Sequence, residues 1–356
     1  MARPLAGTGH RWCREGRSNI VPMAQDVAMD IGTSMSRVAM MGDGVVFNEP
    51  TIVAIDTRSG EVVEVGAGAL DLVARTSRHV VAFRPLAQGA TVDFDVTARL
   101  VSGLFDRVGV SKLSRARVVM SVPSLATAIE RRALRQAAIQ AGAREVSLIE
   151  APLAAAIGLG LPVQDPVGSA VTVLGGGASE ATLLSLGGIV TSATRRQGGL
   201  DVDHAIASMV RHRYGVVIAP STIEQLKISL GSALARTQGR SETVVARTVD
   251  TGDVIEVDVG ADLVNLAVRD VAQAVVGMVQ DSLAGAPPDL SQDVSARGLT
   301  LVGGHAKLMD FAELIASSTG VDVVVADQPD LVIIRGLELC LDEMSSLHAL
   351  FRNADR

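Results

Sequence analysis

The sequence is poor in aromatic residues, in cysteine and in long apolar runs. Aromatic residues make up only 2% of the 356 residues, so the core has to be built from Val, Leu, Ile, Ala and Met. The two cysteines, Cys13 and Cys340, cannot form a disulfide framework, and a reducing cytoplasm is therefore expected. No apolar run reaches the roughly 18 residues that a membrane-spanning helix needs. The net charge of −7 argues against a broad nucleic-acid surface, so no nucleic-acid partner is expected.

Residues 1–23 differ from the rest of the chain. They combine glycine and proline with four arginines, and they hold the only tryptophan, Trp12. One interpretation is a basic arm that touches a membrane. The other is a disordered extension, or a start codon placed too early, with Met23 as the true start. Because glycine and proline oppose a stable amphipathic helix, the sequence favours the disordered extension.

Two glycine-rich turns lie about 140 residues apart, each between two apolar strands. The first is Asp30-Ile31-Gly32-Thr33-Ser34, and the second is Val173-Leu174-Gly175-Gly176-Gly177-Ala178-Ser179. Glycine lets backbone N–H groups approach a phosphate closely because it has no Cβ and tolerates positive φ. Either turn alone is better explained as a plain hairpin. Together with Gly303-Gly304 after a third buried strand, they indicate a duplicated fold that holds one nucleotide from two sides.

The order strand, strand, strand, helix, strand, helix occurs twice along the chain. This pattern predicts an α/β architecture with helices on both faces of two sheets, and a ligand between the halves at the carboxyl ends of strands. Helices are expected at 93–108, 127–142, 152–158, 203–214, 221–235 and 263–283. Strands are expected within 27–55, at 118–122, 145–148 and 299–302, around the second glycine turn, and as an antiparallel pair at 240–258.

Several side chains allow both a functional and a structural interpretation. Glu224 and Lys227 could bracket the ribose and base of a nucleotide, but Ser221 with Glu224 also fits a capping box and Glu224 with Lys227 an ordinary i,i+3 pair. The residues alone favour the structural alternative. His305 is interpreted as a polar residue at a helix start, because no Cys, His or carboxylate cluster supports a metal site or a triad. The valines of 263–283 indicate core; if exposed, they would form a protomer interface.

Longer stretches carry a family resemblance that covers about residues 26–345. In order, they resemble the actin superfamily, and specifically the bacterial rod-shape-determining MreB/Mbl family. The supporting stretches are NEPTIVAI at 48–55, VAFRPL at 81–86, ERRA at 130–133, QAGAREV at 140–146, AAAIG at 154–158 and SLGGIV at 185–190. The resemblance implies the actin-like ATPase fold, in which duplicated ribonuclease H-like domains form four subdomains around a central cleft.

The resemblance also implies a domain division. Lobe I would comprise 24–165 with about 325–356, and would contain a small inserted subdomain at about 46–90. Lobe II would comprise 166–324, with a small subdomain at about 206–282. No flexible linker separates the two.

The family's nucleotide-binding segments match four stretches of this chain. The first phosphate loop matches Gly32, Thr33, Ser34 and Met35, and the second matches Gly175, Gly176, Gly177 and Ala178. The adenosine-contacting helix matches Glu224, Gln225, Leu226 and Lys227. With the resemblance included, the functional interpretation of Glu224 and Lys227 is therefore favoured over the structural one. The adenine loop matches Gly303, Gly304, His305 and Ala306. The implied ligands are ATP and magnesium, with Asp30 as a metal contact through water.

The chain departs from the family pattern where hydrolysis would be carried out. The family's second phosphate loop begins with an aspartate, here Val173, and the glutamate that positions the attacking water corresponds to Ala151. Ala178, Leu200 and His305 replace a threonine, an aspartate and a glycine. Losing one oriented polar group commonly costs about a hundredfold or more in rate. No catalytic residue is therefore expected, and hydrolysis should be impaired or absent.

The predicted function is that of an actin-like cytoskeletal protein in cell-shape and cell-wall morphogenesis. Its expected partners are further copies of itself in filaments, or another MreB-type protein in a copolymer, together with membrane-associated morphogenesis proteins. The expected location is the cytoplasm, at the inner face of the membrane. Because the loop at 109–114 has a single large apolar tip, a protein partner should supply the membrane link. The alternatives are a non-polymerising regulator that caps or joins a complete relative, and an active ATPase.

Overall fold

The computed structural model describes residues 26–69, 72, 79–91, 93–110 and 116–342. The expected N-terminal extension and most of the loop at 109–114 lie outside the described residues. Within the described part, no helix combines the length and the apolar character that crossing a membrane requires.

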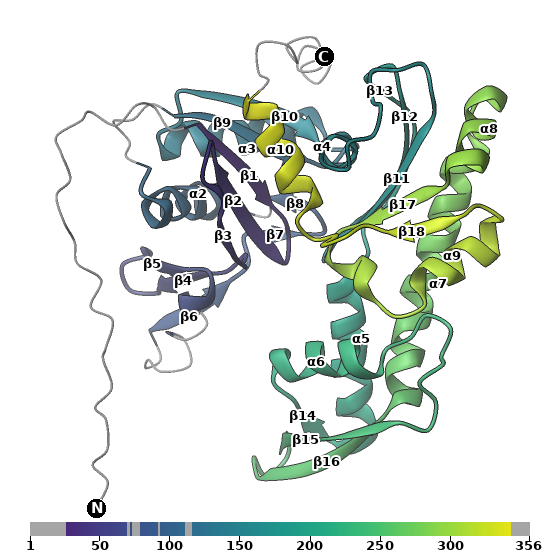
Figure 1. The fold of residues 1–356 in the computed structure, drawn as a ribbon. Coiled ribbons are helices and arrows are strands. Elements are labelled where there is room, and N and C mark those ends of the chain that lie inside the picture. Colours follow the sequence, from purple (N-terminus) through teal and green to yellow (C-terminus); the bar gives the residue numbers. More distant parts are fainter. Residues whose placement is uncertain (1–25, 70–71, 73–78, 92, 111–115, 343–356) are drawn as a thin grey trace, which may run out of the picture.

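Two five-stranded sheets with the same topology form the framework (Figure 1). In each, three consecutive strands pair antiparallel, and the fourth and fifth run parallel to the first. This repetition confirms the duplication predicted from the strand order, and we call the parts built on the two sheets the first and second half. The first sheet has the order β10(Glu145–Glu150)-β9(Arg117–Val122)-β1(Val27–Ile31)-β2(Met35–Met40)-β3(Gly44–Pro50). The second has the order β13(Gly188–Arg195)-β12(Ser179–Ser185)-β11(Ser169–Leu174)-β17(Leu299–Val302)-β18(Val323–Val325).

The helices of the first half begin and end at the residues that local chemistry favours. Asp93 caps α2 by accepting from the N–H of Val96, and Thr127 and Glu130 form the predicted capping box of α3. The last helix, α10, returns to the first sheet and packs against α4. The bounds are α2 Phe94–Val108, α3 Ala128–Ala141, α4 Ala151–Gly158 and α10 Val332–Asp342.

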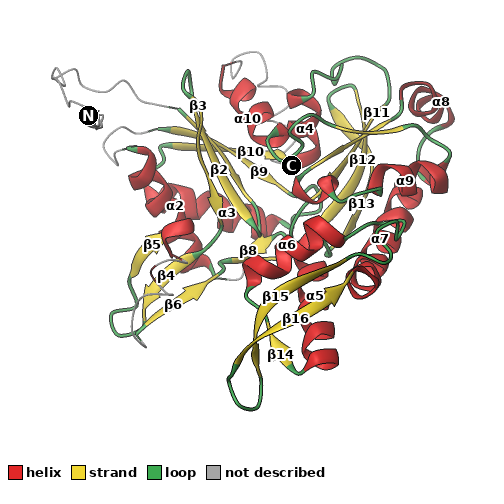
Figure 2. Cartoon of the chain, turned by 60° about the horizontal axis from the view of Figure 1, so that its bottom comes forward, coloured by secondary structure: helices red, strands yellow, loops and turns green. Residues whose placement is uncertain are grey.

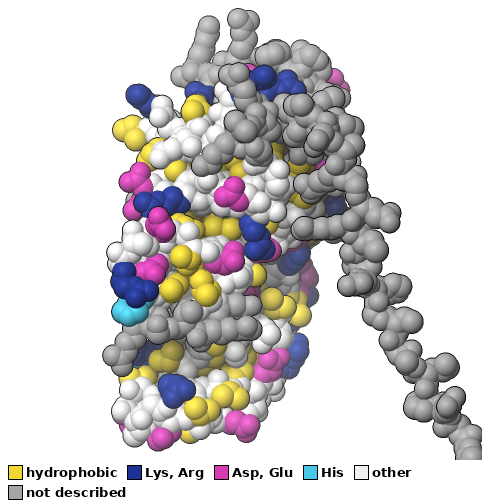
Figure 3. All heavy atoms as spheres, turned by 90° about the vertical axis from the view of Figure 1, so that its left-hand side faces the viewer, with side chains coloured by type: hydrophobic (Ala, Val, Ile, Leu, Met, Phe, Trp, Pro, Cys, Tyr) yellow, Lys and Arg dark blue, Asp and Glu magenta, His cyan; other side chains and the backbone are white. Residues whose placement is uncertain are grey.

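A small sheet extends each half at the same end of the molecule, away from α4 and α10 (Figure 2). Figure 3 shows the side that carries α2 and the first small sheet, where apolar side chains lie between acidic and basic ones. The first small sheet contains β4 Val53–Asp56, β5 Val62–Val65 and β6 Val80–Phe83, and β7 Leu86–Ala87 pairs with β8 Ala90–Thr91 nearby. The second small sheet contains β14 Val216–Val217, β15 Ser241–Thr248 and β16 Val254–Gly260.

The helices of the second half differ from expectation at two ends. Helix α5 begins at Gly199, four residues early, because the Asp201 carboxylate accepts a 2.8 Å bond from the Gly198 N–H. Helix α6 begins after Ala219 with no side-chain cap, so the proposed Ser221–Glu224 capping box was wrong. Helix α6 ends at Leu230 rather than near 235. Just beyond this end, the Ser232 N–H donates to Asn265 Oδ1 instead of to a carbonyl of the helix. The bounds are α5 Gly199–Tyr214, α6 Pro220–Leu230, α7 Ala261–Ala284, α8 Pro288–Arg297, the short 3-10 helix η1 Gly304–Lys307 and α9 Phe311–Thr319.

Each half has its own apolar core, and a third core joins them. The valine stripe of α7 lies in the core of the second half, so the alternative of a protomer interface was wrong. The third cluster, which we call the shared core, takes residues from both sheets and from α4 and α10. Its buried sheet residues are Ala28, Ala39, Val119 and Ile149 from the first half and Val171, Leu184 and Val302 from the second.

Candidate functional site

The two glycine-rich loops meet at the boundary between the halves. A Cβ built on Gly176 would lie 2.6 Å from Ser34 Cβ, and one on Gly177 would lie 2.6 Å from Thr33 Oγ1. Real side-chain atoms do not approach that closely, so only glycine fits at these two positions. The loops that the sequence singled out therefore face each other in contact.

The loops carry backbone donors that the protein itself leaves unused. The N–H of Gly32 closes its own turn on Met35 O at 3.0 Å, and that of Gly175 closes on Ala178 O at 2.9 Å. By contrast, no described residue accepts a hydrogen bond from the N–H groups of Thr33, Ser34, Gly176 or Gly177. Successive free N–H groups in tight turns form concave sites for anions. Donors of this kind can receive an anion such as a phosphate.

Arg84, which the sequence reasoning did not single out, holds the first loop in place. Its Nη1 donates to Thr33 O at 3.3 Å and to Ser34 O at 3.4 Å. Burial lowers the pKa of Arg84, while the negative charges of Glu224 and Asp203 act in the opposite direction. The sequence signal that could have indicated Arg84 is its place in the family-like stretch 81–86, directly after the last strand of the first small sheet.

The residues matched to adenosine binding come together beside the N-terminus of α5. Lys227 Nζ lies 2.7 Å from Asp203 Oδ1 and donates to Gly199 O at 3.1 Å, so Lys227 pairs with α5 and not with Glu224 on its own helix. A Cβ on Gly199 would lie 3.2 Å from His305 Nδ1 and 3.5 Å from Lys227 Nζ. The structure thus brings the α6 segment and the η1 loop to one place.

The remaining matched residues divide between surface and core. Glu224 and Gln225 are exposed, whereas Leu226 and Ala306 are buried in the core of the second half. Met35 begins β2, and Ala178 precedes β12. Gly303 has φ 92°, and a Cβ there would lie 2.3 Å from Leu174 O, which ties the η1 loop to the end of β11.

His305 stands at a helix start, as expected, within the 3-10 helix η1, and it is buried. Only 7% of the residue is accessible, and its ring meets Phe311 edge-on at 5.4 Å between centroids. Burial, and then the charge of Lys227, lowers the pKa of His305 to about 3. The imidazole is therefore neutral near pH 7.

Replacing His305 with asparagine should make the protein less sensitive to acid. Since the folded pKa of His305 is about 3 and the unfolded value is 6.5, its contribution to stability is complete above pH 6.5 and declines as the pH falls towards 3. Below pH 6.5, wild type should lose about 1.4 kcal/mol per pH unit relative to His305→Asn. Urea unfolding at several pH values measures this difference. The exposed His212→Asn is the control, and a His305→Asn curve parallel to wild type would contradict the prediction.

The acidic side of the site is arranged differently from a metal centre. Asp30 accepts a 2.6 Å bond from Ser121 Oγ and lies 3.6 Å from Arg37 Nη1. Val173 and Ala151, the positions where the family has its acidic residues, pack against the shared core. No group of three or more His, Cys, Asp or Glu residues within the described ranges could hold a metal. Of the three acidic positions only Asp30 is an acid, and it is already engaged by Ser121 and Arg37, so this donor set fits a magnesium ion held by the protein poorly.

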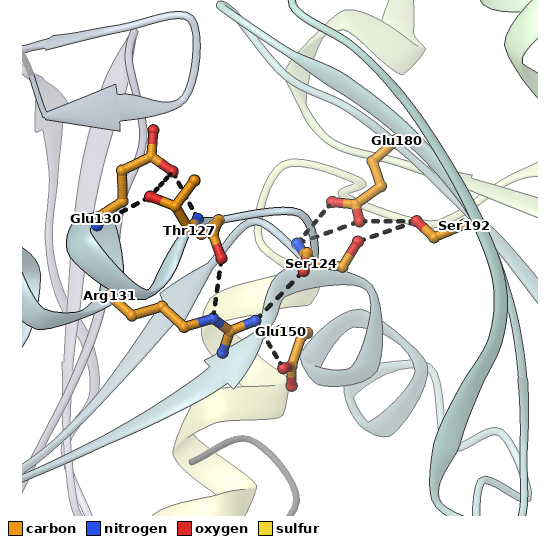
Figure 4. Close-up of polar contacts among 8 residues, drawn as sticks. Ser124, Thr127, Glu130, Arg131, Glu150, Glu180 and Ser192 are labelled. Atoms are coloured by element: carbon orange, nitrogen blue, oxygen red, sulfur yellow. Dashed lines mark hydrogen bonds and ion pairs between the residues drawn. The ribbon is translucent and has the colours of Figure 1, made fainter. Parts of the chain in front are cut away.

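A second feature that the sequence did not reveal is a buried glutamate that bridges the halves (Figure 4). Glu180 on β12 accepts from the Ser124 N–H at 3.2 Å, across the boundary, and from Ser192 Oγ at 3.1 Å. Nearby, Arg131 and Glu150 form an ion pair at 2.9 Å. Burial raises the pKa of Glu180 to about 7, although both hydrogen bonds oppose the shift. Glu180 lies directly across the strand pair from Val173.

Comparison with known proteins gives a consistent result. The family model described as MreB/Mbl protein matches residues 24–349. The cell shape-determining protein MreB of Escherichia coli K12 is 38% identical over 91% of this chain and 95% of its own length. The cell shape-determining protein Mbl of Bacillus subtilis 168 is 32% identical over 91% of this chain and 98% of its own.

Solved structures confirm the predicted actin-like α/β fold. MreB5 of Spiroplasma citri bound to ADP superposes with a TM-score of 0.83 at 25% identity, covering 91% of this chain and 98% of that one. A MamK double helical filament gives a TM-score of 0.74 at 16% identity, covering 90% and 99%. The MamK likeness concerns the fold alone.

Proposed function

Because this chain belongs to the MreB/Mbl family, we propose that it is an actin-like cytoskeletal protein of cell-shape and cell-wall morphogenesis that binds ATP where its two halves meet and hydrolyses it slowly or not at all. The observation that carries the ATP proposal is the pair of glycine loops in contact, with unused N–H donors on both. The adenosine would lie beside Gly199, Lys227 and His305. Any magnesium would arrive on the phosphates of the nucleotide.

The impaired hydrolysis follows from the side chains at the two expected catalytic positions. Hydrolysis of a phosphoanhydride needs an oriented water and a charge-balanced metal. Ala151 cannot orient water, and Val173 cannot bind the hydration shell of a metal. Both are partly buried against the shared core, where they contribute packing. The same positions count against the alternative of an active ATPase.

Calorimetry with ATP and a phosphate-release assay on the same purified chain test this proposal. We expect ATP to bind, and phosphate release to be at least about a hundredfold slower than for a family member that keeps both acids. Gly176→Ala should weaken ATP binding tenfold or more, because the new Cβ would lie 2.6 Å from Ser34 Cβ and force the loops apart. Gly188→Ala is the matched control, since its nearest atom would be 3.9 Å away. Phosphate release at the rate of the complete relative would refute the proposal.

Self-association is the proposed mode of action, as expected for a relative of the cell shape-determining proteins. Sedimentation of the chain alone should yield polymer in the presence of ATP. If the chain sediments only together with a complete MreB-type protein, the alternative of a copolymer partner or regulator applies instead.

The proposed location is the cytoplasm, at the inner face of the membrane. The side that carries α2 mixes apolar with acidic and basic side chains, so charges border its apolar atoms (Figure 3). We therefore assign the membrane link to a morphogenesis protein as partner. Tight binding of the purified chain to lipid vesicles would contradict this assignment.

A further inference from the structure

A buried arginine lies beside the one acid that the first phosphate loop retains. Arg37 on β2 is directly opposite Asp30 on β1, and only 8% of the residue is exposed. Its Nη1 lies 3.6 Å from Asp30 Oδ2, and its Nη2 lies 3.8 Å from Asp330 Oδ2. Two carboxylates from distant parts of the sequence therefore flank one guanidinium, and Asp330 also pairs with Lys307 Nζ at 2.6 Å. Asp30 lies two residues before Gly32, the glycine that begins the first loop.

The guanidinium is charge-balanced, but its hydrogen-bonding capacity is not used. Arg37 Nε is buried and has no hydrogen-bond partner among the described residues. The two ion pairs are longer than hydrogen bonds, so the terminal nitrogens also retain donors. Buried donors without acceptors are costly and rare in folded proteins. An anion bound at the neighbouring loops would supply the missing acceptors.

The same arrangement disfavours a divalent cation. Magnesium takes oxygen ligands and commonly needs one or two carboxylates. Asp30 is already engaged by Arg37 and by Ser121 Oγ at 2.6 Å, and neither Val173 nor Ala151 offers an oxygen in its side chain. A dication placed here would also face a fixed positive charge in a region of low dielectric constant, where repulsion is weakly screened.

We infer that Arg37 is the resident cation of this site: its guanidinium binds the phosphate chain directly and takes the place of the divalent metal. This inference rests on the proposed ATP binding. A guanidinium suits this role because it is always charged and presents a planar fork of donors that matches phosphate oxygens. Asp30 and Asp330 then act as positioning residues that hold the guanidinium. ATP binding should consequently be independent of magnesium.

Calorimetry with ATP, in magnesium and in EDTA, tests the role of Arg37 toward the nucleotide. The wild-type affinity should change less than about threefold between the two buffers. In EDTA, Arg37→Met should lose roughly 10- to 100-fold in affinity, the range for a charge-assisted hydrogen bond, and magnesium should restore part of that loss. A tenfold or larger drop for wild type in EDTA would overturn the inference, as would an Arg37→Met affinity equal to wild type.

A second measurement needs no nucleotide and keeps the inference separate from the proposed function. The thermal midpoint of the nucleotide-free wild type should not respond to millimolar Mn²⁺ or Mg²⁺. The midpoint of Arg37→Met should be lower and should rise with Mn²⁺, because Asp30 then lacks its cation, while Asp330 keeps its ion pair with Lys307 at 2.6 Å. If wild type binds no ATP in any buffer, the proposed function fails while this measurement still decides the identity of the cation. A wild-type midpoint that rises with Mn²⁺, and no longer does so in Asp30→Asn, would overturn the inference.

Two variants control for stability. Arg117→Met removes another partly buried arginine of the first sheet, which pairs with Asp26 before the start of β1. It should lower the midpoint without making it responsive to Mn²⁺ or making ATP binding depend on magnesium. Arg37→Lys keeps the charge without the fork, and should remain unresponsive to Mn²⁺ even if Arg37→Met does not fold. An Arg37→Lys chain that gains stability from Mn²⁺ would count against the inference.

Discussion

Replacing Gly336 with alanine should prevent stable folding, or lower the free energy of unfolding by more than about 3 kcal/mol. A Cβ at Gly336 would lie 1.8 Å from Ala154 O and 2.9 Å from Gly158 N, both of which are backbone atoms of α4. No rotamer change can relieve a clash between two helix backbones. The helices would have to separate, and their separation would open the shared core that joins the two halves. Urea unfolding followed by circular dichroism measures the loss.

Gly277→Ala is the matched control for this experiment. Gly277 lies inside the long helix α7, and a Cβ there would meet no atom within 4 Å. Alanine at that position should stabilise the protein by about 0.5–1 kcal/mol, because glycine is a poor helix former. If Gly336→Ala lowers the free energy of unfolding while Gly277→Ala raises it, the close approach of α4 and α10 is the cause of the loss in Gly336→Ala. Equal stability of Gly336→Ala and wild type would contradict the packing described here.

The fold was predictable because the sequence repeats one local pattern twice. Strand order, the two glycine turns and the Thr127 capping box depend on residues near one another in the chain, where propensity and spacing carry the information. The Ser221–Glu224 capping box failed for a local reason as well. Pro220 takes the first helical position, so the helix begins after Ala219 and Ser221 is already inside it.

The least predictable parts of the site are those that join distant segments. The pairing of Asp30 with Arg37 follows from hairpin register, but its completion by Asp330 depends on how α10 returns to the first sheet. The burial of His305 depends on Phe311 and on the N-terminus of α5. Glu180 follows Ser179 in a segment that shows only an ordinary strand pattern. Its partner Ser124 lies in the other half, and no local pattern indicates that contact.

The buried carboxyl of Glu180 should make the junction between the halves sensitive to pH. Its folded pKa of about 7 lies above the ordinary value of 4.5, so its contribution to stability is complete below pH 4.5 and is lost as the pH rises through 7. Glu180→Gln keeps an acceptor for the Ser124 N–H and the Ser192 hydroxyl but does not ionise. Relative to this variant, wild type should lose about 3 kcal/mol between pH 4.5 and 7 and then remain level.

Urea unfolding of both proteins across pH 4 to 8 measures this difference directly. Because Glu180→Gln leaves His305 unchanged, the opposite pH dependence of the histidine cancels in the comparison. Glu150→Gln is the control: it leaves the hydrogen bonds of Glu180 in place and removes only the minor part of the pKa rise that comes from the charge of Glu150, so most of the pH dependence should remain. If the wild-type and Glu180→Gln curves run parallel, the carboxyl is ionised in the folded protein. The bridge would then be a charged contact throughout the physiological range.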